Sequence, residues 1–309
     1  MIEQEQMETR NQLTISEANT FFIILAVLFL TIGGYVQSRE LISGLLITEF
    51  GIMALPILIY TAIRKKSVKE IFKFRKLQLK TIPKIIVLAA LMLPAVAVAN
   101  LVTIFIIELL GESIVSPVPT ASSPSEFLLL FAVIAGSAGI CEELFFRGAI
   151  LNAFESDLGK KWGAIFSGLL FGIFHFNPQN LFGPILLGIM FAYLVQLTGS
   201  IFAGVIAHIT NNGLAVTLGY VNNLFSTVDT SSSGVTLNSP SALIAVMGFY
   251  LMVAFVCLIG IRAVLRSLRK QYSVTKLWVD EPLTLKFKHY LPIALSLVIY
   301  ALVIKLAYF

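Results

Sequence analysis

Apolar runs recur along the whole chain at the length of membrane-spanning helices. A helix that crosses a bilayer needs about 20 predominantly apolar residues. The two runs near 162–176 and 181–197 are shorter, so they are broken or tilted helices, and eight spans is an alternative to nine. The pattern predicts an all-α fold, a polytopic transmembrane helical bundle with spans near 20–37, 41–63, 85–110, 127–152, 162–176, 181–197, 200–219, 241–262 and 290–308.

The composition supports a membrane protein and argues against nucleic-acid binding. Of the 309 residues, 57% are hydrophobic and only 13% are charged, whereas a soluble domain has about 25% charged residues. The net charge is +5, but no basic arm with interleaved aromatic residues is present. Cys141 and Cys257 both lie inside apolar runs, so a disulfide framework is not expected.

The positions of lysine and arginine predict how the protein is oriented in the membrane, because short cytoplasmic loops are rich in both residues. Residues 64–84 hold nine basic residues and one acid, and residues 262–289 hold seven basic residues and two acids. Residues 111–125 and 221–240 contain no lysine or arginine. With nine spans the two basic loops share one side, which we predict to be cytoplasmic together with the N-terminus. The polar, acidic first 20 residues are not a cleavable signal peptide.

The chain is expected to form a single membrane domain with three parts. Residues 1–126 supply about three spans and the basic loop 64–84. Residues 127–219 are nearly continuous in apolar character and carry the polar residues described next. Residues 220–309 supply an external loop and about two further spans.

Glu142 and Glu143 lie inside the fourth predicted span. Insertion of one ionisable side chain into the membrane costs a few kcal/mol. Arg147 follows Glu143 by four residues, so the two can share a helix face and form a structural ion pair. Glu142 points about 100° away around the helix and cannot easily use the same arginine. An unpaired carboxylate among buried polar groups suits a general base for water. Glu49, in the second span, is assigned to internal pairing or to gating access.

Two of the three histidines lie within or at the ends of predicted spans. His175 follows Phe171 by four residues, and Asn212 follows His208 by four, so each pair can share a helix face. Two histidines with a glutamate are ordinary zinc ligands, and the zinc alternative uses Glu142, His175 and His208. No HExxH helix is present, and we favour a site without metal or other cofactor.

Three motifs occur in order inside the polar-bearing spans. Glu142–Arg147 has the form EExxxR, Phe171–His175 the form FxxxH, and His208–Asn212 the form HxxxN. Together they resemble the CAAX protease and bacteriocin-processing family, also called the Abi family, of intramembrane endopeptidases, to which type II CAAX prenyl endopeptidases belong. The resemblance covers roughly residues 127–219.

The resemblance implies roles for individual residues. Glu142 would activate a water, and His175 would hold or polarise it. His208 and Asn212 would stabilise the oxyanion, while Glu143 and Arg147 would orient the site as a buried pair. The implied activity is hydrolysis of a peptide bond in a membrane-associated peptide or a prenylated protein.

Two other functions are kept as alternatives. A binding or bacteriocin-immunity protein of the same fold would need no turnover. A proton-coupled transporter would use Glu142, Glu143 and His175 as a proton relay, although no inverted repeat of the kind common in transporters is visible. The family suggests a bacterial cell membrane as the simplest location, with a role in peptide-signal maturation or bacteriocin self-protection. The oligomeric state is left open.

Overall fold

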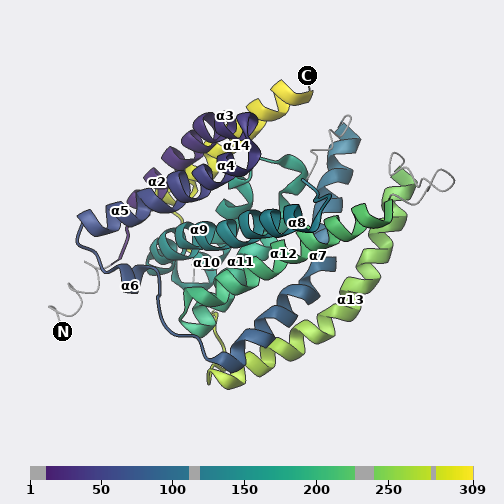
Figure 1. The fold of residues 1–309 in the computed structure, drawn as a ribbon. Helices are drawn as coiled ribbons and strands as arrows, with labels where there is room; N and C mark the ends of the chain where they lie inside the picture. Colours follow the sequence, from purple (N-terminus) through teal and green to yellow (C-terminus); the bar gives the residue numbers. More distant parts are fainter. Residues whose placement is uncertain (1–11, 111–118, 227–239, 280–282, 309) are drawn as a thin grey trace.

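The chain folds as a bundle of helices that run roughly along one direction (Figure 1). The computed structural model describes residues 12–110, 119–226, 240–279 and 283–308. Within these residues every regular element is a helix, so the all-α prediction is confirmed. Six helical stretches are long and apolar enough to cross a membrane, and two shorter apolar helices accompany them.

The first two spans form a helical pair that begins earlier than the apolar pattern predicts. The first helix starts at Ile15 because Thr14 and Glu17 form a capping box, in which each side chain accepts a hydrogen bond from the other residue's backbone N–H. The pair comprises α2 (Ile15–Leu28), η1 (Phe29–Gly33), α3 (Gly34–Arg39), α4 (Leu41–Leu46), η2 (Ile47–Ala54) and α5 (Leu55–Ile63).

Short elements in the basic loop lead to the third span and then to the fourth. These are α6 (Val68–Ile71), η3 (Leu79–Thr81), α7 (Ile82–Leu110), α8 (Pro124–Leu130), η4 (Phe131–Ser137), α9 (Ala138–Glu143) and η5 (Leu144–Ile150). The segments η1, η2, η4 and η5 have π-helical hydrogen bonding. Such wide turns often mark functional sites in helices, and η5 directly follows the two glutamates.

Gly159 divides the helical stretch Pro124–Phe174 into two antiparallel arms. Its φ of 78° and ψ of 170° interrupt α10 (Leu151–Phe174), and a glycine adopts this backbone without strain. The Phe154 and Phe166 rings then stack at 5.2 Å, and Ser167 donates a hydrogen bond to the Phe146 carbonyl. The described helices therefore form nine apolar segments, and the fourth extends to residue 158 rather than 152.

The remaining helices complete the bundle. They are η6 (Pro178–Asn180), α11 (Phe182–Thr198), α12 (Ile201–Ser226), α13 (Pro240–Gln271) and α14 (Phe287–Tyr308). In Figure 1, α9, α10, α11 and α12 lie between the layer of α2–α5 with α14 and the layer of α7 with α13. The polar-bearing spans are thus the central ones.

The two basic loops lie at the same end of the bundle, as predicted. Gln271, at the end of α13, bonds to Thr81 and Gln78 beside the start of α7, and Lys84 bonds to Gln271. At the opposite end Asn223 of α12 bonds to the Ala121 carbonyl.

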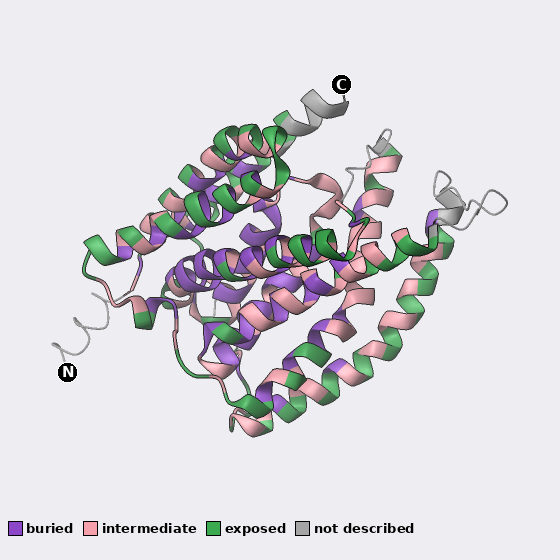
Figure 2. Cartoon of the chain, in the orientation of Figure 1, coloured by how far each residue is buried: buried purple, intermediate pink, exposed green. Residues whose placement is uncertain are grey.

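Burial is concentrated in the central layer, and the outer helices expose apolar side chains (Figure 2). On α13, Phe249, Met252 and Phe255 are more than half exposed. A lipid-facing surface has this composition, since hydrocarbon solvates apolar side chains and polar ones are buried inside. The finding confirms an integral membrane protein.

Candidate functional site

Glu143 and Arg147 form an ion pair in the centre of the bundle. Arg147 Nη1 lies 3.1 Å from Glu143 Oε1, and both side chains are completely buried. Arg147 also donates to the Gly188 carbonyl through Nη2, and its guanidinium lies over the Phe171 ring at 4.5 Å. The four-residue spacing therefore produces the buried pair that the sequence predicts.

His208 of α12 connects the two glutamates. Its Nδ1 is 3.1 Å from Glu143 Oε1, and its Nε2 is 3.9 Å from Glu142 Oε2. The second distance is too long for a hydrogen bond. An atom beside the line between Nε2 and Oε2 can nevertheless approach both groups, so a water or a carbonyl oxygen placed there would contact a carboxylate and an imidazole at once.

Aromatic rings enclose this polar cluster. Phe191 stacks on the His208 ring at 5.2 Å, and Phe171 meets it edge-on at 5.6 Å. Phe171 and Phe191 are both at most 2% exposed. Apolar walls lower the local dielectric, which strengthens interactions between the polar groups that they surround.

His175 lies at the end of α10 against Phe171, the ring that also meets His208. His175 caps the C-terminus of α10, its Nδ1 pairs with the Phe171 carbonyl at 2.8 Å, and its ring meets Phe171 at 5.0 Å. Within the described residues no hydrogen bond or ion pair joins it to Glu142 or His208. The sequence predicts three motifs around one pocket, and for His175 the structure shows proximity through a shared aromatic ring only.

Asn212 lies one turn beyond His208 on the same helix, as its spacing predicts. It donates from Nδ2 to the Ile134 carbonyl of η4 at 3.1 Å and accepts from Asn211 through Oδ1. The amide nitrogen carries two N–H groups, so one remains for a ligand.

The predicted zinc ligands do not form a ligand set as they lie. Across the described ranges, no three His, Cys, Asp or Glu side chains are grouped to hold a metal ion. No chemical step is therefore derived through a metal.

Two residues outside the three motifs, Glu49 and Gly204, lie beside the site. Glu49 of η2 is 6% exposed and lies within electrostatic range of Glu142, and its Oε2 has no hydrogen-bond partner among the residues that the structure describes. The internal pairing expected for it is therefore not seen there. Gly204 of α12 lies so close to Glu143 that a Cβ on it would overlap the carboxylate. Glu49 was visible in the sequence only as an intramembrane charge, and no local signal marks Gly204.

Comparison with known families agrees with the three motifs. Residues 124–214 match the family model described as type II CAAX prenyl endopeptidase Rce1-like. This part of the chain is similar to the CAAX protease family. All six predicted site residues lie inside the match, which covers less than a third of the chain. Comparisons with curated proteins and with solved structures give no match. The matching family consists of proteases, which supports a membrane-embedded hydrolase of this type.

Proposed function

We propose that this chain is an intramembrane endopeptidase that hydrolyses a peptide bond of a membrane-associated substrate with a glutamate-activated water. The observation that carries the proposal is the position of Glu142. Its Oε2 lies 3.9 Å from Nε2 of His208, whose ring is bordered by Phe171 and Phe191, and this oxygen has no hydrogen-bond partner among the described residues. A carboxylate that is not committed to a structural partner remains available as a base.

The reaction follows from these positions. Glu142 takes a proton from a water as the water oxygen attacks the carbonyl carbon of the substrate. The carbonyl oxygen becomes an oxyanion, which N–H donors stabilise. Asn212 has an N–H left for it. His208, whose Nδ1 faces Glu143, donates to it from Nε2 in the imidazolium form, which carries a proton on both ring nitrogens. Glu142 then returns the proton to the leaving amine as the C–N bond breaks. The products are a carboxylic acid and an amine.

Glu143 and Arg147 act as positioning residues in this scheme. Glu143 holds His208 through Nδ1 at 3.1 Å, which fixes the ring with Nε2 toward Glu142. Arg147 balances the charge of Glu143 where neither side chain meets water. His175 would help to hold or polarise the water, as the resemblance implies, and it lies against the same Phe171 ring that meets His208.

The substrate class rests on the family match. A CAAX-type protease acts on a membrane-associated protein, so the proposed substrates are prenylated peptides or, in a bacterial cell membrane, peptide signals and bacteriocin-related peptides. Glu142 lies within a membrane-spanning helix and its side chain is 14% exposed, which fits a substrate that enters from the bilayer or its edge.

The test is a cleavage assay with purified protein on a prenylated CAAX peptide and on candidate signal peptides. Glu142→Gln keeps the shape of the side chain but removes the base. General-base catalysis contributes about 10²- to 10⁴-fold to a rate, so the cleavage rate is expected to fall by that factor. The matched control is Glu70→Gln, since Glu70 is half exposed in the basic loop and pairs only with Arg75 at the surface.

The same pair of variants separates the alternatives. A binding or immunity protein would show no cleavage in either form and would keep substrate binding in Glu142→Gln. A transporter would instead accumulate its substrate in vesicles in response to a proton gradient. Full cleavage by Glu142→Gln would end the protease mechanism proposed here.

A further inference from the structure

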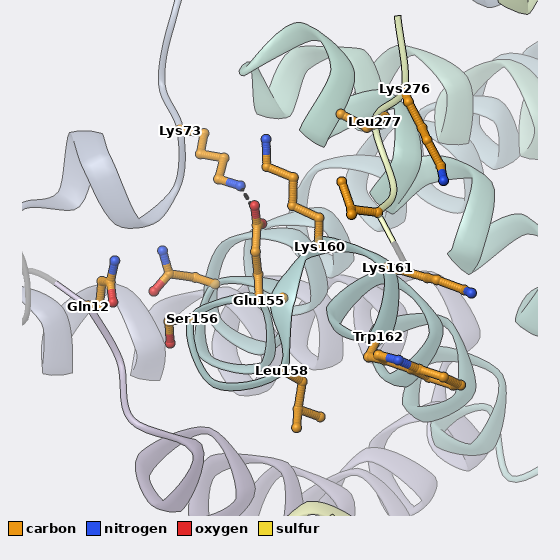
Figure 3. A pocket seen from close by; sticks show the side chains of 13 residues that line it. Gln12, Lys73, Glu155, Ser156, Leu158, Lys160, Lys161, Trp162, Lys276 and Leu277 are labelled. Carbon is orange, nitrogen blue, oxygen red and sulfur yellow. Dashed lines mark hydrogen bonds and ion pairs between the residues drawn. The ribbon is translucent and has the colours of Figure 1, made fainter. Parts of the chain in front are cut away.

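A polar cavity lies at the end of the bundle that carries the basic loops, and Figure 3 shows the side chains that line it. Its volume is about 610 Å³, and its walls come from the basic loop, the hairpin around Gly159 and the segment after α13. Glu155 follows Glu142 by 13 residues along one helical stretch, which corresponds to about 20 Å. The cavity is therefore separate from the proposed active site.

Lysines dominate the charge of this cavity. Lys73, Lys160, Lys161 and Lys276 line it, and Glu155 is the one acidic residue among the lining residues that the structure describes. Lys73 forms an ion pair with Glu155 at 2.9 Å, drawn as the dashed line in Figure 3. The remaining lysines come from two separate segments, so the fold brings positive charge together from distant parts of the sequence.

The start of a helix adds to this positive field. Gly159, with its φ of 78°, ends the first arm of the hairpin, and the second arm resumes at Lys160. Lys160, Lys161 and Trp162 therefore occupy the first turn, where backbone N–H groups are unpaired within the helix and the dipole favours an anion. These same three residues line the cavity.

The cavity also has an apolar edge. Leu158, Leu277 and Val279 line it beside the lysines, and Val279 is 57% exposed. Trp162 lines the cavity as well. Tryptophan is typical of the membrane–water interface. Cationic groups next to an apolar edge, at the end of the spans, suit an amphipathic anion.

We propose that this cavity binds the phosphate-bearing headgroup of an anionic membrane lipid. The lysines and the first turn of the second arm hold the phosphate, and the apolar edge receives the beginning of the acyl chains. The same lysines suit free phosphate, but a soluble anion gains nothing from the apolar edge. The proposal does not depend on the proposed protease activity, because it uses none of the residues around Glu142.

The experiment measures lipid binding to the full-length protein. Delipidated protein in detergent is titrated with phosphatidylglycerol or with phosphatidylcholine, and retained lipid is counted by native mass spectrometry. We expect one phosphatidylglycerol to bind in preference to phosphatidylcholine. The double variant Lys160→Gln/Lys276→Gln should weaken that binding about tenfold or more, since a lysine near an anionic lipid contributes about 1 kcal/mol.

The control is Lys69→Gln/Lys80→Gln, which removes two exposed lysines of the same basic end that do not line the cavity. It should bind phosphatidylglycerol as the unmodified protein does. An equal loss in both double variants would show diffuse surface attraction and overturn the proposal. So would displacement of the lipid by millimolar inorganic phosphate, which would identify a free-phosphate site. If the first double variant does not fold, Lys160→Gln alone replaces it, because Lys160 is exposed.

Discussion

The guanidinium of Arg147 has no contact with solvent, so its charge is balanced entirely by what surrounds it. Glu143 supplies the opposite charge at 3.1 Å, the Gly188 carbonyl accepts one N–H, and the Phe171 ring lies beneath the plane of the group. Replacing one member of a buried ion pair leaves the other charge unpaired, which is far more costly than replacing both.

This predicts the effect of Arg147→Gln on stability. The free energy of unfolding should fall by about 3–5 kcal/mol, the usual cost of breaking a buried ion pair. The measurement is the midpoint of thermal unfolding in detergent, which should be lower in the variant. The double variant Glu143→Gln/Arg147→Gln should recover much of that loss, because no buried charge remains. A double variant as unstable as the single one would show that the ion pair is not the origin of the effect.

A chelator tests the metal-free preference. Among the described residues no three His, Cys, Asp or Glu side chains are grouped to hold a metal ion, so we expect cleavage to be unchanged after treatment with EDTA. The measurement is the initial cleavage rate before treatment, after it, and after zinc is added back. Loss of activity that zinc restores would replace the water-activation scheme with a metal-dependent one.

Local spacing predicts some contacts of the site and not others. Glu143 with Arg147 follows from a four-residue interval on one helix. The approach of His208 to both glutamates requires the packing of α12 on α9, which no interval within one helix encodes. Glu49 is 93 residues before Glu142 in the sequence, and its place beside the site comes from the packing of η2 on α9. The position of His175 depends on where α10 ends.

Close packing of helices controls the site at the scale of elements. Gly204 allows α12 to lie against the Glu143 carboxylate. Gly168 and Gly188 allow α10 to lie against α11, because a Cβ on Gly188 would be only 2.8 Å from the Gly168 Cα. Small residues permit such approaches between membrane helices. The apolar pattern predicts a turn between residues 152 and 162, but it does not predict that the turn lies at Gly159, because the φ of 78° there is not visible in the sequence.

Gly204→Ala tests this packing. The added methyl would overlap Glu143, so the carboxylate must move and carry His208 with it. Overpacking of this kind costs about 1–3 kcal/mol, and we expect reduced cleavage together with a lower unfolding midpoint. The matched control is Gly219→Ala on the same helix, where the nearest atom to a new Cβ is the Thr120 methyl at an ordinary 3.5 Å. Equal effects of the two substitutions would exclude a specific role for the Gly204 contact.

At the scale of the whole molecule, the order of the helices brings both basic loops to the same end of the bundle. The apolar pattern predicts nine segments with both basic loops at one end, and the described helices have this arrangement. The pattern did not predict the ends of the segments, which depend on caps such as Thr14 with Glu17. It also did not predict that the lysines of two loops and a hairpin line one cavity, since that requires the assembled bundle.

The side of the membrane on which each end lies is a separate prediction from the positive-inside rule. Single cysteines placed in a background without Cys141 and Cys257 report it. Lys69→Cys lies in the basic loop and Ser125→Cys lies at the opposite end, and both positions are exposed. A membrane-impermeant thiol reagent applied to intact cells should label Ser125→Cys at once, and Lys69→Cys only after the membrane is permeabilised.

The labelling result also bears on both proposed sites. If Lys69→Cys is the position labelled in intact cells, the lysine cavity faces the outside and the search for its lipid moves to the outer leaflet. Labelling of both positions in intact cells would instead place the two ends on one side, which an odd number of crossings between them forbids. Among the described residues between 69 and 125 (69–110 and 119–125) there is one long apolar helix, α7, whose 29 residues extend about 44 Å. That length exceeds the hydrocarbon core of about 30 Å, so a single crossing is sufficient to separate them.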